Sequence, residues 1–430
     1  MVEQENLTAS QVRQPRLPIP PPLWMSEESS FAHLTLTQRL PAIVGRVLEE
    51  NNFPPTITQK LERLIQELPY GIVRSLQDDQ GQDLAAWANY LEPFEGRRWI
   101  DIPWYFAEVY FYRRILEATQ YFLPGEWQGI DPFEPQKRSS LEKVMHSIRD
   151  MSTQVNTFVK TKLDREAEWN QTELITLLYF ALWGNRIDLS LFPTDAGEHK
   201  RSQIETYREQ ANILVDDTAI LADRIASFDG VRLDFIVDNA GFELFCDLCL
   251  ADFLLNIGAA GTVYLHLKAQ PLFVSDAMVK DVHYTLEVLA TDRDSEVQSL
   301  AHRLQEHIAQ GRLQCCEHPF WTAPLSFWEM PEELHRDLDQ SHLIIVKGDA
   351  NYRRCLGDRQ WSFTTPFHDI VCYFPASFVT LRTLKSEIVV GLQLEQVEAL
   401  NHEDPQWLTN GQWGVIQSFE PTASGLITKG

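Results

Sequence analysis

Between residues 230 and 420 the sequence alternates short apolar stretches with helical segments, and this alternation constrains the fold more than any other feature. The stretches at 231–237 (VRLDFIV), 262–267 (TVYLHL) and 343–346 (LIIV) are rich in residues that strands favour. The segment at 241–255, between the first two, is predicted to be a helix. Apolar strands that alternate with helices are typical of a mostly parallel sheet covered on both faces.

Weaker signals extend this pattern. Short strands are predicted at 271–275 (PLFVS), 378–381 (FVTL) and 414–419 (GVIQSF), and a helix is predicted from 277 to about 290. The predicted fold class is α/β, with a mostly parallel sheet sandwiched by helices in a Rossmann-like α/β/α arrangement.

The N-terminal half has a helical pattern instead. Apolar residues recur at helical spacing in Ser140–Met151, after a serine start signal, and the apolar run at 175–184 ends at Gly184. The proline-rich stretch at 15–24 cannot continue a helix or join a central strand, so an extended arm is expected there. We therefore predict an arm at 1–30, an all-α domain or cap at 31–225 and an α/β domain at 226–430.

Charge and composition narrow the function. A formal net charge of −24 argues against nucleic acid as a partner, because the field of the whole protein repels a polyanion. A small anionic substrate is compatible with this charge if local cations or a metal invert the field. No signal peptide and no apolar run of membrane-spanning length is evident, and six scattered cysteines suit reduced thiols. We expect a cytoplasmic protein without membrane spans, and the sequence does not predict its oligomeric state.

Polar residues follow three of the predicted strands: Asp238-Asn239, Ser275-Asp276 and Lys347-Gly348-Asp349. Ligands in open α/β sheets bind outside the carboxyl ends of strands. Carboxylate and amide oxygens suit magnesium or manganese, which polarise a phosphoryl oxygen and activate water. A simpler alternative stays open, because Asp and Asn often only end strands and cap the next helix.

Basic residues near the same strand ends would neutralise a phosphate. If a helix begins at RTLK (382–385), Arg382 and Lys385 share one of its faces, and its first N–H groups add to an anion site. A solvated basic pair is the alternative. The candidate cations are Lys347, Arg353, Arg382 and Lys385.

Four motifs resemble, in order, those of the damage-control phosphatases of the domain-of-unknown-function-89 family, subfamily III, also called the acidic residue methyltransferase group. RTLK matches the RTxK signature of that subfamily. The resemblance covers roughly residues 30–420, and Ala350 departs from it where a leucine is common. The motifs are 235–248 (FIVDNAGFELFCDL), 271–276 (PLFVSD), 347–358 (KGDANYRRCLGD) and 382–385, with helical-half segments at 105–115, 182–191 and 212–217.

The resemblance implies a metal-dependent phosphatase that acts on a small phosphorylated metabolite, such as the sugar phosphate fructose 1-phosphate. Manganese, nickel or cobalt is the implied metal, with magnesium possible, and Asp238, Asn239 and Asp276 are the implied ligands and catalytic residues. The implied substrate-binding residues are Asp238, Asn239, Lys347, Asp349, Ala350, Asn351, Tyr352, Arg353, Arg382 and Lys385. Asp349 and Asp276 both stay open as the group that orients the attacking water.

Some positions carry other implications. Glu243 matches a position assigned to S-adenosylmethionine contact in family members said to methylate protein carboxylates. Asp276 is the second contact that the resemblance implies. Lid or substrate residues, or buried polar links between domains, are expected at Glu108, Arg113, Asn185, Arg186 and Asp188.

Three other functions each fit some of the residues. An S-adenosylmethionine-dependent protein carboxyl (glutamate) O-methyltransferase usually has a glycine-rich turn after its first strand, and here Asp238-Asn239-Ala240-Gly241 follows instead. This favours phosphatase chemistry without excluding a second activity. The pair Asp292 and Asp294 superficially fits a haloacid-dehalogenase phosphatase, although a solvated loop explains it better. Structural zinc at Cys246, Cys249, Cys315, Cys316 and His318 is disfavoured, since the first two cysteines lie in an apolar helical run.

Overall fold

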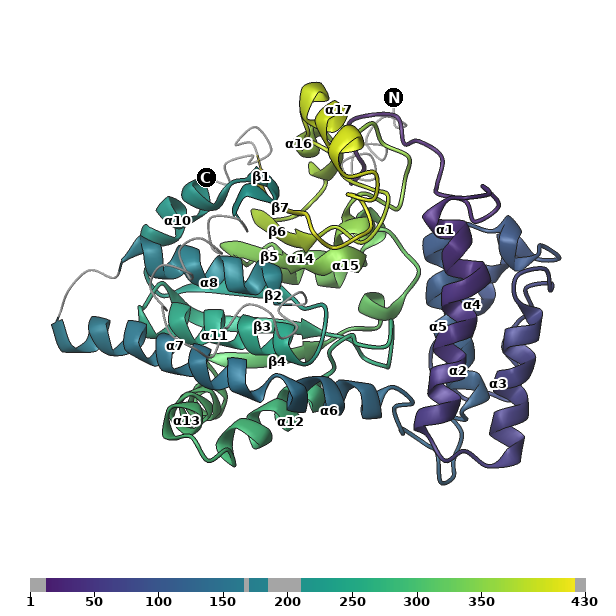
Figure 1. The fold of residues 1–430 in the computed structure, drawn as a ribbon, viewed down its shortest axis with the longest axis horizontal. Coiled ribbons are helices and arrows are strands. Elements are labelled where there is room, and N and C mark those ends of the chain that lie inside the picture. The colour runs from purple at the N-terminus through teal and green to yellow at the C-terminus, as the bar shows by residue number, and fades with distance from the viewer. Residues whose placement is uncertain (1–12, 166–169, 185–209, 422–430) are drawn as a thin grey trace, which may run out of the picture.

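The computed structural model describes residues 13–165, 170–184 and 210–421, which form an α-helical lobe beside a larger α/β body (Figure 1). The helical lobe surrounds α5, in which every residue is buried. Its helices are α1 (Phe31–Leu34), continued through a π-helical turn (Thr35–Arg39) into α2 (Leu40–Glu50), then α3 (Pro55–Glu67), α4 (Leu84–Leu91) and α5 (Trp104–Ala118).

The body is built on a seven-stranded sheet with the order β1-β7-β6-β5-β2-β3-β4. All neighbouring strands are parallel except β6 and β7. This confirms the predicted α/β fold with a mostly parallel sheet. The strands are β1 (Ile213–Asp216), β2 (Val231–Ile236), β3 (Ala260–Leu267), β4 (Leu313–Glu317), β5 (Leu343–Lys347), β6 (Phe378–Thr383) and β7 (Gly414–Phe419).

Helices cover both faces of the sheet. Alternate strand residues point to opposite sides, so that Ile345 packs in one core and its neighbours Ile344 and Val346 pack in another. On the Ile345 side and around the β4 edge lie α7 (Met145–Arg165), α8 (Gln171–Trp183), α10 (Thr218–Ala226), α11 (Phe242–Asn256), α12 (Val279–Ala290) and α13 (Ser295–Ala309). On the other side lie α14 (Glu332–Leu338), α15 (Gly348–Cys355), α16 (Phe367–Val371) and α17 (Leu394–Glu403).

The register of the central strands positions the loops that follow them. Ile236 of β2 lies opposite Val346 of β5 and His266 of β3. Residues two positions beyond these pairs therefore lie at one level, which places Asp238 next to Gly348. The strand ends at which ligands bind in open α/β sheets thus meet in the centre of this sheet.

Several predicted elements differ from the structure. The segment at 271–275 is a loop and not a strand, because Phe273 and Val274 have φ angles of +46° and +67°, outside the β region. No helix begins at RTLK, since Arg382 lies inside β6 and the chain after it is irregular. The helix predicted for Ser140–Met151 is two helices, because α6 (Glu134–Lys143) ends before α7 begins at Met145. Strands β1 and β4 were not predicted.

The hydrophobic cores divide the chain differently from the predicted boundary near residue 225. Helices α7 and α8 pack in the same core as the sheet, whereas the core of the helical lobe draws on residues 25–133 and Leu272. The predicted domain division stays a prediction. The N-terminal arm, described from residue 13, runs extended along the body and then joins the lobe, with Leu23 N donating to Asp358 O. Within the described residues, no helix is both long and apolar enough to cross a membrane.

Candidate functional site

Three predicted residues meet where β2 ends, and we call Asp238, Asn239 and Asp276 the strand-end corner. Asn239 and Asp276 form an isolated antiparallel bridge, and Ala277 N donates to Asp238 O at 2.8 Å. The loop before Asp276 therefore folds back onto the end of β2. The structure thus brings together all three residues predicted as metal ligands.

A glycine allows the neighbouring turn to approach the strand-end corner. Gly348 has a φ angle of +79°, and a Cβ atom there would lie 1.9 Å from Asp238 Oδ2. Any side chain at this position would be strained and would displace the carboxylate. The start of α15 is thus held directly against Asp238.

Two carboxylate oxygens of the strand-end corner lack hydrogen bonds. Asp238 Oδ1 is buried and accepts none from the described residues. Asp276 Oδ2 also accepts no hydrogen bond from the described residues, although the ammonium of Lys268 lies 3.3 Å from it. Buried polar atoms nearly always have partners, so these two oxygens fit the donor set of a cation site.

Hydrogen bonds fix the carboxamide of Asn239. Its Nδ2 donates to Asp238 Oδ2 and to Glu243 Oε2, both at 2.9 Å. Its Oδ1 accepts from Ser275 Oγ at 2.5 Å. The second lone pair of Oδ1 is still available, so the carboxamide oxygen remains a candidate ligand.

The strand-end corner is electrostatically unbalanced. Burial, Asp276 and Glu243 together hold the pKa of Asp238 well above its usual range. Burial raises the pKa of Asp276 to about 6, although the ammonium of Lys268 acts in the opposite direction. These carboxylates would bind a cation more readily than stay ionised alone.

Lys347, predicted to clamp phosphate, points beneath the strand-end corner. Its ammonium lies 2.8 Å from Asp247 Oδ1 and 3.6 Å from Glu243 Oε1, and it also donates to Ala181 O. Lys347 and Asp247 are both fully buried. In this structure Lys347 therefore supports α11 and, through Glu243, the carboxamide of Asn239.

Arg382 and Asp349 are paired with each other. Arg382 Nε donates to Asp349 Oδ1 at 2.8 Å, and its other nitrogens donate to Ser386 Oγ and to the carbonyls of Ser386 and Ile388. Asp349 Oδ1 also accepts from Lys385 N and Ser386 Oγ. Burial opposes ionisation, but the guanidinium groups of Arg382 and Arg353 outweigh it and lower the pKa of Asp349.

Arg353 joins the body to the helical lobe. Its Nη1 donates to Glu108 Oε2 of α5 at 2.6 Å, and its Nε donates to Asp358 Oδ1 at 2.7 Å. The guanidinium lies 3.7 Å from the centre of a Trp104 ring, and its Nη2 is buried without a partner among the described residues. Glu108, expected at a lid or a link between domains, thus forms a link.

The remaining predicted residues of α15 differ in accessibility. Asn351 is buried and donates to Lys347 O at 2.9 Å, while its Oδ1 has no partner among the described residues. The hydroxyl of Tyr352 donates to Gln417 Oε1 at 2.7 Å. Its ring lies under the guanidinium of Arg382. Ala350 is half-buried.

Lys385 differs from the other predicted cations. Its side chain is half-buried, and within the described residues its ammonium has no hydrogen bond or ion pair. It is near enough to Asp238 to lower the pKa of that carboxyl, against the larger effects of burial and neighbouring acids. It is therefore the predicted cation that can most readily meet a ligand.

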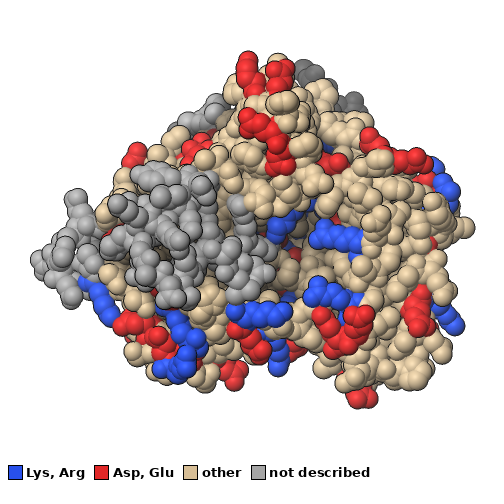
Figure 2. Space-filling model, in the orientation of Figure 1, with Lys and Arg blue, Asp and Glu red and all other residues tan. Residues whose placement is uncertain are grey.

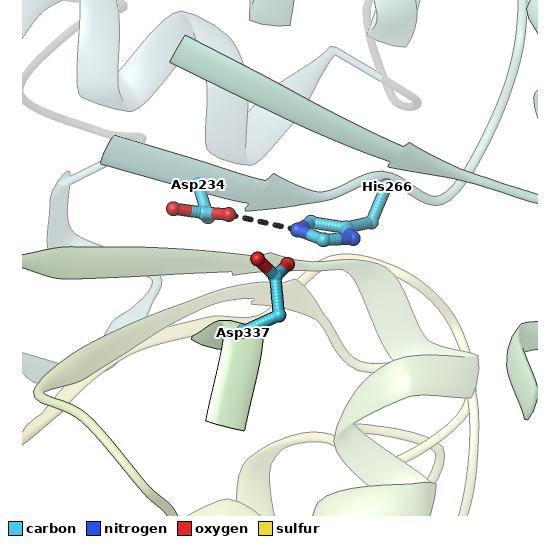
Figure 3. Close-up of side chains that lie close together, drawn as sticks. All are labelled: Asp234, His266 and Asp337. Carbon is cyan, nitrogen blue, oxygen red and sulfur yellow. Dashed lines mark hydrogen bonds and ion pairs between the residues drawn. The ribbon is translucent and has the colours of Figure 1, made fainter. Parts of the chain in front are cut away.

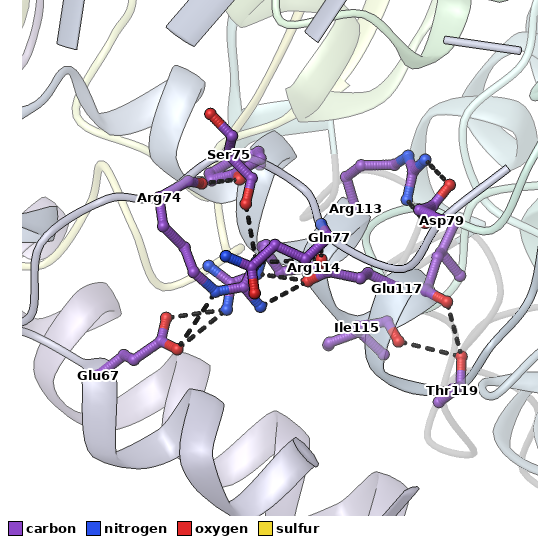
Figure 4. A network of polar contacts seen from close by, with 12 residues as sticks. Glu67, Arg74, Ser75, Gln77, Asp79, Arg113, Arg114, Ile115, Glu117 and Thr119 are labelled. Atoms are coloured by element: carbon purple, nitrogen blue, oxygen red, sulfur yellow. Dashed lines mark hydrogen bonds and ion pairs between the residues drawn. The ribbon is translucent and has the colours of Figure 1, made fainter. Parts of the chain in front are cut away.

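Arg113 lies away from this site. It is buried in the helical lobe, where its guanidinium pairs with Asp79 and Asp83 at 2.8 Å, beside a second network centred on Arg114 and Glu117 (Figure 4). The ion pairs of Arg113 therefore give it a structural role within the helical lobe. Asn185, Arg186 and Asp188 lie outside the described residues.

A second acidic group, formed by Asp234, His266 and Asp337, has ligand atoms within 4.8 Å of one another (Figure 3). With Arg232 we call it the inner cluster. Arg232 donates to both carboxylates, at 2.8 and 2.9 Å to Asp234 and at 3.0 and 3.1 Å to Asp337. His266 Nε2 lies 2.8 Å from Asp234 Oδ1. These carboxylates are already compensated, so a metal would have to displace Arg232.

The rival metal and nucleophile sites are not assembled. Asp292 accepts two hydrogen bonds from Arg149, and Asp294 caps α13 through Glu296 N. Cys246 and Cys249 are buried in α11, and within the described chain no set of three ligands suitable for a metal includes a cysteine.

A cavity of 410 Å³ opens beside Asn239, Glu243 and Ser275, and it extends toward the helical lobe. Arg46 of α2 and Lys143 of α6 lie on its wall. Figure 2 shows basic side chains gathered around the hollow between the lobe and the body. Local cations therefore offset the overall negative charge where an anionic substrate would enter.

The sequence model of the damage-control phosphatase ARMT1-like domain matches residues 35–400. The chain belongs to this family. Damage-control phosphatase ARMT1 of Danio rerio is 33% identical over 431 residues, covering 92% of this chain and 96% of the relative. The Mus musculus protein is 34% identical over 430 residues, covering 92% and 97%. A solved DUF89 family protein from Pyrococcus horikoshii is 16% identical, covers 82% of this chain and 91% of that chain, and has a TM-score of 0.42.

Membership confirms the predicted family and the enzyme class, since this is a family of phosphatases. Sequence reasoning missed Lys268 and Asp247 as contributors to the site. Lys268 directly follows β3, so the strand-end rule applied to the other candidates would have found it. Asp247 lies inside an apolar helix, where no local signal distinguishes it.

Proposed function

We propose that the strand-end corner holds one divalent metal through Asp238, Asn239 and Asp276, and that the site hydrolyses a phosphate ester of a small metabolite. The observation that carries this proposal is the buried Asp238 Oδ1, which has no partner among the described residues. Carboxylate and carboxamide oxygens suit manganese, nickel, cobalt or magnesium. Such a metal, when bound, supplies a Lewis acid for the phosphoryl group.

The charges around the strand-end corner support one divalent ion. Four buried carboxylates lie there, Asp238, Glu243, Asp247 and Asp276, together with the buried ammonium groups of Lys268 and Lys347. The excess of two negative charges equals the charge of one divalent cation. Burying this excess without a cation is costly, because few solvent dipoles reach it.

Lys385 is the group that we assign to the phosphate, because it is accessible and unpaired within the described chain. The unpartnered Nη2 of Arg353 supplies a second donor. Lys347 and Arg382 act indirectly, since their donors already bond to the protein. Ala350, Asn351 and Tyr352 lie in α15, and the bonds of Asn351 to Lys347 O and of Tyr352 to Gln417 fix the start of this helix beside the proposed substrate site.

Asp349 is the residue that we assign to orienting the attacking water. Its Oδ1 accepts three hydrogen bonds, whereas Oδ2 accepts none from the described residues. Its lowered pKa keeps it ionised, so it accepts a hydrogen bond better than it removes a proton.

Glu243 is assigned to positioning, because its carboxylate accepts from Asn239 and lies beside Lys347. This assignment favours phosphate release over methyl transfer from S-adenosylmethionine. Sugar phosphates such as fructose 1-phosphate are the proposed substrate class, and the cytoplasm is the proposed compartment.

The test is a screen for phosphate release from sugar phosphates with each divalent metal, run beside a methyl-transfer assay. We expect metal-dependent release that Asp238→Asn lowers by about 100-fold or more, as for removal of a group that stabilises the transition state. Asp337→Asn, in the inner cluster, is the matched control and should keep full activity. Undiminished release by Asp238→Asn, or methyl transfer without metal-dependent release, would reject the proposal.

A further inference from the structure

The cavity beside the strand-end corner has a wall that the proposed chemistry does not use. This wall is the first half of α6 and its C-terminal turn, which contribute Gln136, Ser139, Ser140 and Lys143. A cavity of 410 Å³ is larger than a phosphate group needs, so the organic part of a substrate fits there.

Helix α6 is fixed close to the turn that carries the strand-end corner. Gly241 follows that turn with a φ angle of +76°, and a Cβ atom there would lie 2.8 Å from Ser140 Oγ. Lys137 anchors the helix, because its buried ammonium lies 3.0 Å from Asp131 and 2.9 Å from Asp281 of α12. The polar face of α6 is therefore held against the turn that follows Asn239.

Two side chains on this face have unused hydrogen-bonding groups. Gln136 Nε2 is buried, lines the cavity and has no partner among the described residues. Ser139 is half-buried, and its hydroxyl makes no hydrogen bond with any described residue. Ser140 instead donates to Lys137 O at 2.7 Å. A buried amide donor without a partner indicates a ligand oxygen, since such groups are almost always satisfied.

We propose that Gln136 and Ser139 form the subsite for the leaving group of the substrate and determine specificity by bonding to its hydroxyl groups. This inference rests on the proposed function, because it assigns the part of the cavity next to the proposed metal. A carboxamide and a hydroxyl are neutral and directional, so they suit hydroxyl groups as hydrogen-bond partners. Gln136 donates from Nε2 to a hydroxyl oxygen, and Ser139 both donates and accepts.

The experiment compares two phosphate esters that differ in the leaving group. The leaving group of fructose 1-phosphate carries hydroxyl groups, whereas the leaving group of p-nitrophenyl phosphate carries none in the ester. For Gln136→Leu we expect kcat/KM on fructose 1-phosphate to fall about 3- to 10-fold, mostly through KM, as for one lost neutral hydrogen bond. On p-nitrophenyl phosphate, kcat/KM should stay within about twofold, because that substrate makes no such bond. Gln136→Leu with Ser139→Ala should widen the difference.

Gln310→Leu is the matched control, because Gln310 is exposed at the C-cap of the far helix α13 and its side chain bonds only to Glu306 among the described residues. It should leave both substrates unchanged. An equal fall on both substrates for Gln136→Leu, or no change on either, would overturn the proposed subsite.

A binding measurement separates this inference from the proposed function. The metal-free wild-type protein and Gln136→Leu are titrated with fructose 1-phosphate and with inorganic phosphate. Weaker binding of the sugar ester by the variant, with phosphate binding unchanged, supports the subsite even without turnover. Equal binding of the sugar ester overturns it, whereas absence of phosphate release by wild type contradicts only the proposed function.

Discussion

Asp234 and Asp238 lie four residues apart, one inside β2 and one just beyond it, and their surroundings are opposite. Asp234 bonds to Arg232 and His266, and these cationic and donor groups outweigh burial and lower its pKa. Asp238 has no basic partner in contact, one of its oxygens lacks a hydrogen bond in the described structure, and burial with Asp276 raises its pKa.

Carboxylate oxygens that have no hydrogen-bond or ion-pair partner therefore indicate a metal site better than the number of carboxylates does. The inner cluster has three ligand-type residues close together but is already neutralised by Arg232. The strand-end corner also has two carboxylates, but its excess charge is not compensated within the described residues. Paired groups should therefore affect stability, and unpaired groups should affect binding and catalysis.

The largest effect is expected at Lys347, a paired group. Lys347→Met should lower the free energy of unfolding by about 3–5 kcal/mol, because it leaves the buried carboxylates of Asp247 and Glu243 without their cation. Denaturant unfolding of the metal-free protein measures this. A variant of wild-type stability with a raised KM would instead show that Lys347 contacts the phosphate.

A matched pair of substitutions tests the contrast between the two aspartates directly. Asp234→Asn should lower the free energy of unfolding by about 2 kcal/mol, because it weakens buried hydrogen bonds to charged groups. Asp238→Asn in the metal-free protein should leave stability unchanged or raise it, because it removes an uncompensated buried charge. Equal losses in both variants would break the comparison.

Substitution of Lys385, which is unpaired within the described chain, should affect substrate binding more than stability, whereas substitution of Lys347 should mainly affect stability. Lys385→Met should raise the KM for a phosphate ester about 10-fold, as for one lost charge-assisted contact, with unfolding changed by less than about 0.5 kcal/mol. Steady-state kinetics and denaturant unfolding provide the two values. A stability loss comparable with that of Lys347→Met would assign Lys385 to the scaffold.

The smallest effect concerns pH. The folded metal-free chain holds a proton on Asp276 up to about pH 6, whereas an unfolded chain releases it near pH 4. The contribution of Asp276 to stability is therefore fully present below about pH 4 and is lost as the pH rises through about 6. Unfolding curves from pH 4 to 7 should show this slope in wild type and a smaller slope in Asp276→Asn, where the raised pKa of Asp238 still contributes. Metal affinity should rise over the same range, because the metal displaces that proton.

The sequence predicted the elements that have strong local patterns. Strands β2, β3, β5 and β7 and the helices that follow β2 and precede Gly184 are found as expected, because their apolar runs are buried in the sheet and its covering helices. The loop at 271–275 was predicted as a strand because Phe273 and Val274 favour strands, yet tertiary contacts hold both at positive φ angles. Their aromatic neighbours, such as Tyr112 against Phe273, come from the helical lobe, which local patterns cannot show.

The candidate site was predictable in composition but not in pairing. The strand-end rule and the family motifs predict from the sequence alone that Asp238, Asn239 and Asp276 lie together. They did not show that Lys347 and Arg382 form ion pairs with Asp247 and Asp349, since those contacts depend on packing between distant elements.

The assignment of the metal to the strand-end corner is tested most directly by a calorimetric titration of the metal-free protein with Mn²⁺. Wild type and Asp337→Asn should bind one ion per chain, and Asp238→Asn should bind none in the same concentration range. Binding that survives in Asp238→Asn but is lost in Asp337→Asn would place the metal in the inner cluster and contradict the account.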